Sequence, residues 1–189
     1  LSKHLDHLKQ NVIAGFNITC IGDERCYSLL PSRNGKTLSD RIALHVLKHT
    51  DPGFKMYTWL DRGSDERQYC APGVDLPIAT IMRSKYGEYP EYHTSLDDLY
   101  LVTPAGLEGG FTAIKRSIEI IEKNDYFKTA VICEPQLGKL GLYQTLSNKE
   151  SGNQEQVMLN LISYCDGANS LLEIAELMGE PFWEIISMI

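Results

Sequence analysis

Residues 61–98 read DRGSDERQYCAPGVDLPIATIMRSKYGEYPEYHTSLDD, and this stretch decides how the rest of the chain is interpreted. A short apolar run after Pro77 is typical of a buried strand, and polar loops flank it on both sides. The first loop is charged and contains Gly63, and the second carries Tyr92 and His93. Loops at the two ends of a buried strand are where a scaffold usually presents its binding side chains. We therefore expect the functional residues in these two loops.

The composition is that of a globular protein with one good core and room for a small second module. The chain has 189 residues, of which 43% are hydrophobic and 23% are charged. Its net charge of -7 disfavours partners that need a basic face, so we expect no binding to nucleic acid or to an anionic membrane. No apolar run approaches the roughly 18 residues that span a bilayer. Five scattered cysteines without a C-x-x-C motif indicate free thiols in a reducing cytoplasm.

Apolar periodicity predicts the regular elements of the first 148 residues. Helices are expected at 2–10, 38–50 and 107–124, the second of them capped by Thr37 or Ser39. Strands are expected at 12–21, 54–60, 77–82 and 129–133. The fold class that we predict is α/β, with a mostly parallel central sheet flanked by helices.

The pattern of the sequence changes near residue 149, and we predict a second module over residues 149–189. Ser170 and Glu173 have capping-box spacing, and Gly179 ends the helix that they begin. Pro181 suits the first turn of a third helix. Three short helices with a tight turn resemble the helical part of a winged helix, without the wing that would follow.

The charge of this module argues against DNA binding. Residues 151–189 contain no Lys or Arg and six acids: Glu155, Asp166, Glu173, Glu176, Glu180 and Glu184. A recognition helix without cations cannot neutralise phosphates. We expect the module to contact protein, either another chain or its own.

Two residues at strand ends are candidates for metal binding. Asp23 directly follows the strand predicted at 12–21, and His93 follows the strand predicted at 77–82. An imidazole together with carboxylates from separate strand ends suits a divalent metal, zinc above all. Such an ion polarises a carbonyl group and acidifies bound water. Asp97 and Asp98 are interpreted as caps of the next segment.

The stretches GSDERQYCAPGVDLP and YHTSLDDL resemble the co-catalytic di-zinc aminopeptidase family, which includes bacterial leucine aminopeptidases and glutamate carboxypeptidase. The resemblance implies two zinc ions per site, with His93 as a ligand to one and Asp23 as a ligand to the other. It also implies four substrate-binding residues: Ser64, Asp65, Arg67 and Tyr92.

The resemblance covers residues 11–125 for the peptidase-like part and the remainder for the tail. It is strongest to an aminopeptidase-like branch that carries a C-terminal winged helix and is associated with bacterial surface-polysaccharide gene clusters. The family's other ligands and its Glu-Glu pair precede the position of Asp23, and no Glu-Glu occurs in this chain. The chain therefore resembles a C-terminal half that holds two metal ligands and no catalytic base, and its start at Leu1 agrees with a piece of a longer protein.

Three functions remain open at this point. The first is the C-terminal part of a zinc-dependent aminopeptidase-like hydrolase that acts on a peptide or aminoacyl bond and is inactive as this chain alone. The second is a silent relative, linked to surface-polysaccharide biosynthesis, that binds a peptide, an amino sugar or an aminoacyl group. The third is an interaction scaffold assembled through the acidic tail. A homo-oligomer is compatible with all three, because sheet edges that lack their neighbours promote self-association.

Overall fold

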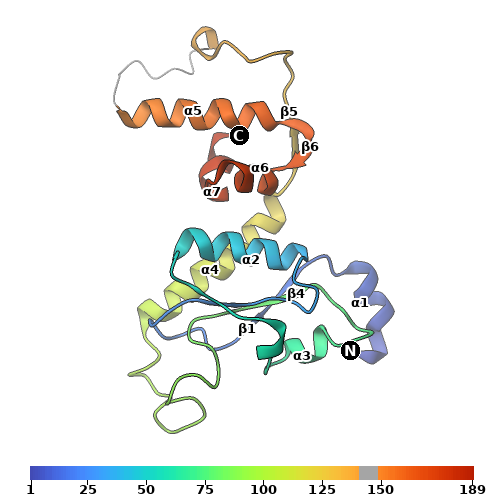
Figure 1. The fold of residues 1–189 in the computed structure, drawn as a ribbon, viewed down its shortest axis with the longest axis vertical. Coiled ribbons are helices and arrows are strands. Elements are labelled where there is room, and N and C mark those ends of the chain that lie inside the picture. The colour runs from blue at the N-terminus through green and yellow to red at the C-terminus, as the bar shows by residue number, and fades with distance from the viewer. Residues whose placement is uncertain (141–148) are drawn as a thin grey trace. The chain divides into compact units, whose positions relative to one another are not determined.

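The computed structural model describes residues 1–140 and 149–189, which form two compact units (Figure 1). The first unit, Leu1–Ile121, is an α/β domain, and the second, Glu122–Ile189, contains short helices and a two-stranded sheet. Among the described helices, none combines the length and the apolarity needed to cross a membrane.

The first unit confirms the predicted α/β fold, in which a sheet that contains parallel strand pairs is flanked by helices. Its strands, in spatial order, are β1 (Gly15–Ile18), β4 (Ile78–Met82), β2 (Ser28–Leu30) and β3 (Lys55–Met56). β1 runs parallel to β4 and β2 runs parallel to β3, whereas β2 and β4 are antiparallel. The strand predicted at 12–21 is shorter than expected, and β2 was not predicted.

Four helices accompany this sheet: α1 (Leu5–Asn11), α2 (Leu38–Thr50), α3 (Glu66–Tyr69) and α4 (Pro104–Lys123). Figure 1 shows α2 and α3 on opposite sides of the strands. The core lies where α2 packs on the two central strands, and Leu29, Val46 and Ile81 are fully buried there. The two inner strands are almost fully buried, and Ser28 and Thr80 are buried there beside the apolar residues.

Thr37 caps the N-terminus of α2, whereas Ser39 connects the helix to the sheet. The Thr37 hydroxyl accepts a hydrogen bond from the Asp40 amide, and the Asp40 carboxylate accepts one from the Thr37 amide at 2.8 Å. This is a capping box, which satisfies two backbone donors at the start of the helix. The Ser39 hydroxyl instead donates to the Pro77 carbonyl and accepts from the Gly15 amide. It therefore ties α2 to the beginnings of both β1 and β4.

The strand predicted over residues 54–60 is wrong beyond Met56. A 3₁₀ helix occupies Trp59–Asp61, and Thr58 caps it. The Asp61 carboxylate accepts hydrogen bonds from the Thr58 amide and hydroxyl at 2.9 and 2.8 Å. Such local side-chain bonds give the backbone an alternative to the sheet.

α4 lies very close to the loop that follows β1. A Cβ atom at Gly106 would stand 2.0 Å from the Gly22 carbonyl oxygen, and one at Gly110 would stand 2.6 Å from the Ile21 carbonyl oxygen. Only glycine allows backbone to approach backbone this closely. The helix therefore fixes the position of the loop that leads into Asp23.

The second unit comprises β5 (Tyr126–Lys128), β6 (Asp166–Ser170), α5 (Lys149–Tyr164), α6 (Leu171–Met178) and α7 (Phe182–Ile185). The predicted Ser170–Glu173 capping box is confirmed, and α6 ends at Gly179, whose φ is +72°.

One expectation for this part of the chain differs from the structure, and the expected domain boundary is not tested by it. The strand predicted at 129–133 is wrong, because antiparallel pairing with β6 places the strand at Tyr126–Lys128. The domain boundary expected between residues 148 and 149 falls on residue 148, outside the described residues. The two compact units divide at residues 121 and 122, which assigns β5 to the second unit.

Candidate functional site

The strand directions bring two loops together at one end of the first sheet. β1 and β4 are parallel, so their carboxyl ends lie at the same edge, and Ser28 at the start of antiparallel β2 pairs with Met82 there. The loop after β1 consequently meets the loop after β4, and the Arg83 amide donates to the Cys20 carbonyl at 2.9 Å. The carboxyl edge of an open α/β sheet is the usual place for a ligand.

Asp23 joins these two loops. Its side chain is buried, and its carboxylate accepts hydrogen bonds from the Ser84 amide and hydroxyl, both at 2.8 Å, and from the Arg25 amide at 2.9 Å. The Asp23 carbonyl accepts from Arg83 Nε at 2.7 Å. Three of these four hydrogen bonds connect the loop after β1 with the loop after β4. Asp23 is therefore a structural link as well as a candidate ligand.

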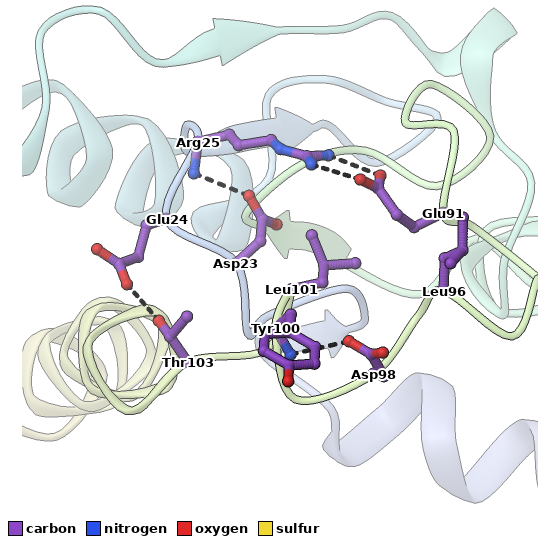
Figure 2. A pocket seen from close by; sticks show the side chains of 9 residues that line it. All are labelled: Asp23, Glu24, Arg25, Glu91, Leu96, Asp98, Tyr100, Leu101 and Thr103. Carbon is purple, nitrogen blue, oxygen red and sulfur yellow. Dashed lines mark hydrogen bonds and ion pairs between the residues drawn. The ribbon is translucent and has the colours of Figure 1, made fainter.

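One pocket beside Asp23 has a volume of about 480 Å³ and is called the acidic pocket here (Figure 2). Its lining comprises Asp23, Glu24, Arg25, Glu91, Leu96, Asp98, Tyr100, Leu101 and Thr103.

Figure 2 shows how the polar side chains of the acidic pocket are held. Arg25 forms two hydrogen bonds with Glu91, at 2.9 and 2.7 Å. That contact lowers the pKa of Glu91 and raises the pKa of Arg25. The Thr103 hydroxyl donates to Glu24, and the Tyr100 amide donates to the Asp98 carboxylate within a turn. Since Arg25 is the one cation among the lining residues and is paired with Glu91, the pocket presents net negative charge.

A second pocket, of about 370 Å³, is called the aromatic pocket here. Its lining comprises Cys20, Ile21, Gly22, Asp23, Tyr89, Tyr92, His93, Asp97, Leu101, Val102 and Leu107. The His93 ring stacks on Tyr92 with 3.9 Å between ring centroids, and His93 has a φ of +58°, which is uncommon for a residue with a side chain. Burial raises the pKa of Tyr89, and its hydroxyl hydrogen bond to the Cys20 thiol raises it further.

The structure groups three of the predicted site residues and separates three others. Asp23, Tyr92 and His93 line the aromatic pocket together. The other three lie in or beside α3 and line neither pocket: Ser64, Asp65 and Arg67. Within their segment, Arg67 Nε donates to the Ser64 carbonyl at 3.2 Å. A role of this segment in substrate binding stays a prediction.

Glu66 is a central residue of that segment that sequence reasoning missed. Its side chain has no exposed surface, and it accepts hydrogen bonds from the Gly63 and Ser64 amides at 2.7 and 2.9 Å. It also accepts from the Tyr86 hydroxyl and the Asn17 amide group, both at 2.9 Å. Burial alone would raise the pKa of Glu66, but these hydrogen bonds outweigh burial and the pKa lies below its ordinary value. Glu66 thus fastens the loop to β1 and to the segment after β4.

The residues at the pocket fit zinc in type but not in number. A carboxylate and an imidazole are ordinary zinc ligands, and a structural or catalytic site needs three or four protein ligands. In residues 1–140 and 149–189, no group of three or more His, Cys, Asp or Glu side chains is placed to hold a metal. We therefore derive no catalytic step through a metal held by this chain alone.

The spacing His-x-Asp, which could supply a further ligand pair, occurs twice in the chain. His4 and Asp6 lie at the start of α1, and His49 and Asp51 lie at the end of α2. Neither pair lines the acidic or the aromatic pocket. The missing ligands are consequently not supplied by these residues in this arrangement.

Comparison with known proteins assigns a family to each unit. Residues 1–124 match the model of a family described as a domain of unknown function (DUF4910), and residues 125–189 match a winged helix-turn-helix family. The second match agrees with the winged-helix resemblance of the tail.

A protein of Clostridium acetobutylicum is similar along almost the entire chain. It is 36% identical over 187 residues, which are 98% of this chain and 43% of that protein, and it is provisionally named a polysaccharide biosynthesis protein with an aminopeptidase-like domain. A crystal structure from the same organism, provisionally identified as a peptidase, has a TM-score of 0.82 and 34% identity over 98% of this chain and 41% of its own. An aminopeptidase from Aneurinibacillus sp. strain AM-1 has a TM-score of 0.46 and 16% identity over 61% of this chain and 26% of its own, which is too distant to support an argument. The chain thus spans about two fifths of the length of the Clostridium relatives.

Proposed function

Because the chain belongs to the family described as a domain of unknown function (DUF4910), with a winged helix-turn-helix behind it, we propose that it is the C-terminal part of an aminopeptidase-like hydrolase that uses zinc. The bond that it acts on would be a peptide or aminoacyl bond. One observation carries the proposal: Asp23 and His93, from loops 70 positions apart, line the same pocket at the carboxyl edge of the sheet. The aminopeptidase-like domain in the name of the Clostridium relative supports it.

In this proposal Asp23 and His93 are ligands to two different zinc ions, and the remaining ligands come from outside this chain. Zinc, when bound, would polarise the carbonyl of the scissile bond and acidify a water molecule. The chain's own residues bind and orient the substrate. Tyr92 presents its ring beside His93, and the negative charge of the acidic pocket favours a substrate with a free amino group.

The proposal includes that this chain alone does not hydrolyse peptides. Hydrolysis needs a base within reach of the attacking water. Asp23 is occupied by three hydrogen bonds, and Glu91 is held in its charged, paired form by Arg25. Both carboxylates already accept hydrogen bonds from neighbouring groups, so neither is free to serve as that base.

A second candidate is a non-catalytic module that binds an aminoacyl group or an amino sugar in the same pockets. The hydrogen bonds of Asp23 favour it, since they stabilise the loop without a metal. The name of the Clostridium relative, which refers to polysaccharide biosynthesis, agrees with a sugar ligand.

Calorimetric titration with zinc separates the two candidates. The chain is compared with His93→Ala and Asp23→Asn, and His4→Ala is the matched control because His4 is exposed and outside both pockets. Because the chain supplies one ligand to each ion, the hydrolase proposal expects weak zinc binding by the chain alone, with an affinity that falls at least about tenfold in the first two variants and is unchanged in the control. Zinc content of the longer Clostridium acetobutylicum relative is measured in parallel. Absence of zinc from both proteins would overturn the zinc-dependent reading and favour the binding module, and hydrolysis of aminoacyl anilides by this chain alone would contradict the proposed inactivity.

A further inference from the structure

A third pocket of the first unit, of about 310 Å³, is called the polar pocket here. Its lining includes five polar residues: Ser32, Arg33, Asn34, Thr37 and Asp75. They come from the segments just after β2 and just before β4, and these antiparallel strands place both segments at one edge of the sheet. The acidic and aromatic pockets lie at the opposite edge, beyond the carboxyl end of β4, and share no lining residue with the polar pocket.

Hydrogen bonds within this chain fix the walls of the polar pocket. The buried Asp40 carboxylate accepts from the Ser32 amide and hydroxyl, both at 2.6 Å, and from the Thr37 hydroxyl at 2.8 Å. Arg33 Nε donates to the Asp75 carboxylate at 2.8 Å, which links the segment after β2 to the segment before β4. The shape of the pocket is therefore set by residues of this chain and needs no neighbouring polypeptide.

The charges at the polar pocket compensate each other, which disfavours an ionic ligand. Among the lining residues, Arg33 is the one cation and Asp75 the one anion, and the guanidinium lowers the pKa of the Asp75 carboxyl. The N-terminus of α2 beside Thr37 would suit an anion, but the Asp40 carboxylate already occupies it. A charged ligand would therefore lose its hydration without gaining a free counter-charge.

Hydrogen-bonding groups of both kinds remain available to a ligand in this pocket. In residues 1–140 and 149–189, the Asn34 side chain has no hydrogen-bond partner, and its amide group contains both a donor and an acceptor. Arg33 uses Nε and Nη2 on Asp75, which leaves the N–H groups of Nη1. The Ser32 and Thr37 hydroxyls donate to Asp40 and each keep a lone pair as an acceptor. Donors and acceptors without net charge match hydroxyl groups, since each hydroxyl both donates and accepts.

We propose that the polar pocket binds a neutral sugar. Adjacent hydroxyl groups of the sugar donate to and accept from the Asn34 amide group, and Arg33 Nη1 donates to a further sugar oxygen. Leu76, which also lines the pocket, adds an apolar surface against which C–H groups of the ring pack. Small-molecule sites have volumes of roughly 300–1,000 Å³, so a pocket near the lower limit suits a single ring.

The proposal is independent of the hydrolase assignment. No residue of the polar pocket lines the acidic or the aromatic pocket, and no metal is involved in its ligand binding. The zinc titration described above therefore tests the hydrolase proposal alone, and the following experiment tests the polar pocket alone.

The test titrates the isotope-labelled chain with sugars of similar size and different charge, followed by NMR amide chemical shifts. D-glucose, D-galactose and D-mannose are the neutral probes, D-glucosamine is the cationic probe, and D-glucuronate is the anionic probe. We expect at least one neutral hexose to shift the amide resonances of residues 32–37 and 70–76, with a Kd of about 1–10 mM. Both charged sugars are expected to bind there at least about threefold more weakly.

Three variants assign the binding to particular side chains. Asn34→Ala removes a donor and an acceptor, so we expect the neutral hexose to bind at least about fivefold more weakly. Asn160→Ala is the matched control with no change, because Asn160 is exposed on α5 in the second unit. Arg33→Gln leaves the Asp75 carboxylate without its cation, and D-glucosamine is then expected to bind at least as tightly as the neutral hexose. Circular dichroism verifies that each variant is folded.

The proposal is overturned if none of the neutral hexoses shifts the resonances of residues 32–37 and 70–76. It is also overturned if a charged sugar binds there to the wild-type chain as tightly as the neutral hexoses, or if Asn34→Ala leaves their binding unchanged. Shifts confined to residues of the acidic and aromatic pockets would overturn it as well, and they would favour the non-catalytic binding module instead.

Discussion

Asp23 and Glu66 are two buried carboxylates of the first unit with similar partners and different surroundings. Each closes a loop against the sheet by accepting hydrogen bonds from backbone amides and from a hydroxyl group. Asp23 also lines the acidic and the aromatic pocket, whereas Glu66 lines neither. Both carboxylates are buried and hydrogen-bonded, so both have a structural role. Asp23 alone of the two also lines a pocket, where it can contact a ligand.

The largest expected effect separates the two carboxylates by stability. Glu66→Gln keeps the shape of the side chain but turns an amide group toward donors that need an acceptor. We expect the free energy of unfolding to fall by about 3 kcal/mol or more, because buried donors lose their partner. Urea denaturation measures this loss, and Glu108→Gln, at an exposed position of α4, is the control, for which we expect a loss of no more than about 0.5 kcal/mol. An equal effect in both variants would show that the buried network contributes little.

His45 is a third buried titratable group, and folding favours its neutral form. Burial, together with the charges of His49 and Lys48, lowers the pKa of His45 from 6.5 to about 4. The unfolded chain then binds the proton more readily, so stability is lost as the pH falls from 6.5 to 4. The full shift corresponds to about 3 kcal/mol, and we expect about 2 kcal/mol after allowing for solvent screening.

The pH windows distinguish this histidine from Glu66. The lowered pKa of Glu66 places its loss of stability below its ordinary value of 4.5, at more acidic pH than that of His45. Unfolding followed at a series of pH values in wild type and His45→Asn checks the assignment. If wild type and His45→Asn lose the same amount of stability between pH 6.5 and 4.5, groups other than His45 cause that loss.

Asp23→Asn is expected to have a smaller effect than Glu66→Gln. It places an amide group where the Ser84 amide and hydroxyl and the Arg25 amide all donate. We expect a loss of about 1–2 kcal/mol, since the loop can adjust toward the pocket. A double-mutant cycle with Ser84→Ala measures the coupling, and a coupling of zero would contradict the link between the two loops.

The smallest effect is expected at the rim of the acidic pocket. Arg25 and Glu91 form an exposed pair, and such pairs contribute little to stability. Arg25→Ala is expected to leave the midpoint of thermal unfolding unchanged while making the pocket more negative. Calorimetry checks the midpoint, and a clear decrease would show that the rim supports the fold.

The elements that could be predicted are those specified by local chemistry. α2 occupies 38–50 with its cap at Thr37, and α6 begins at the predicted capping box, because a cap depends on residues three positions apart. β2 and β6 were not predicted because neither shows an alternating pattern. The three residues of β2 are all buried, and β6 is defined by its pairing with β5. Such strands depend on partners that are distant in the sequence.

The candidate site could be predicted in part for the same reason. Asp23 and His93 were recognised from their positions after apolar strands, and both line one pocket. Glu66 stands in a charged loop and was not singled out, since nothing near it in the sequence indicates burial. Its partners Asn17 and Tyr86 lie 49 and 20 positions away.

The contact between Gly106 and the Gly22 carbonyl divides the site into a part that tolerates variation and a part that does not. The separation between α4 and the loop is set by two backbones, so any side chain at position 106 displaces the loop that carries Asp23. Leu96 and Tyr100 at the rim are exposed and can change without moving a helix. Evolution towards a different ligand would therefore change the rim residues first. The rim is also where the pocket can be engineered by substitution.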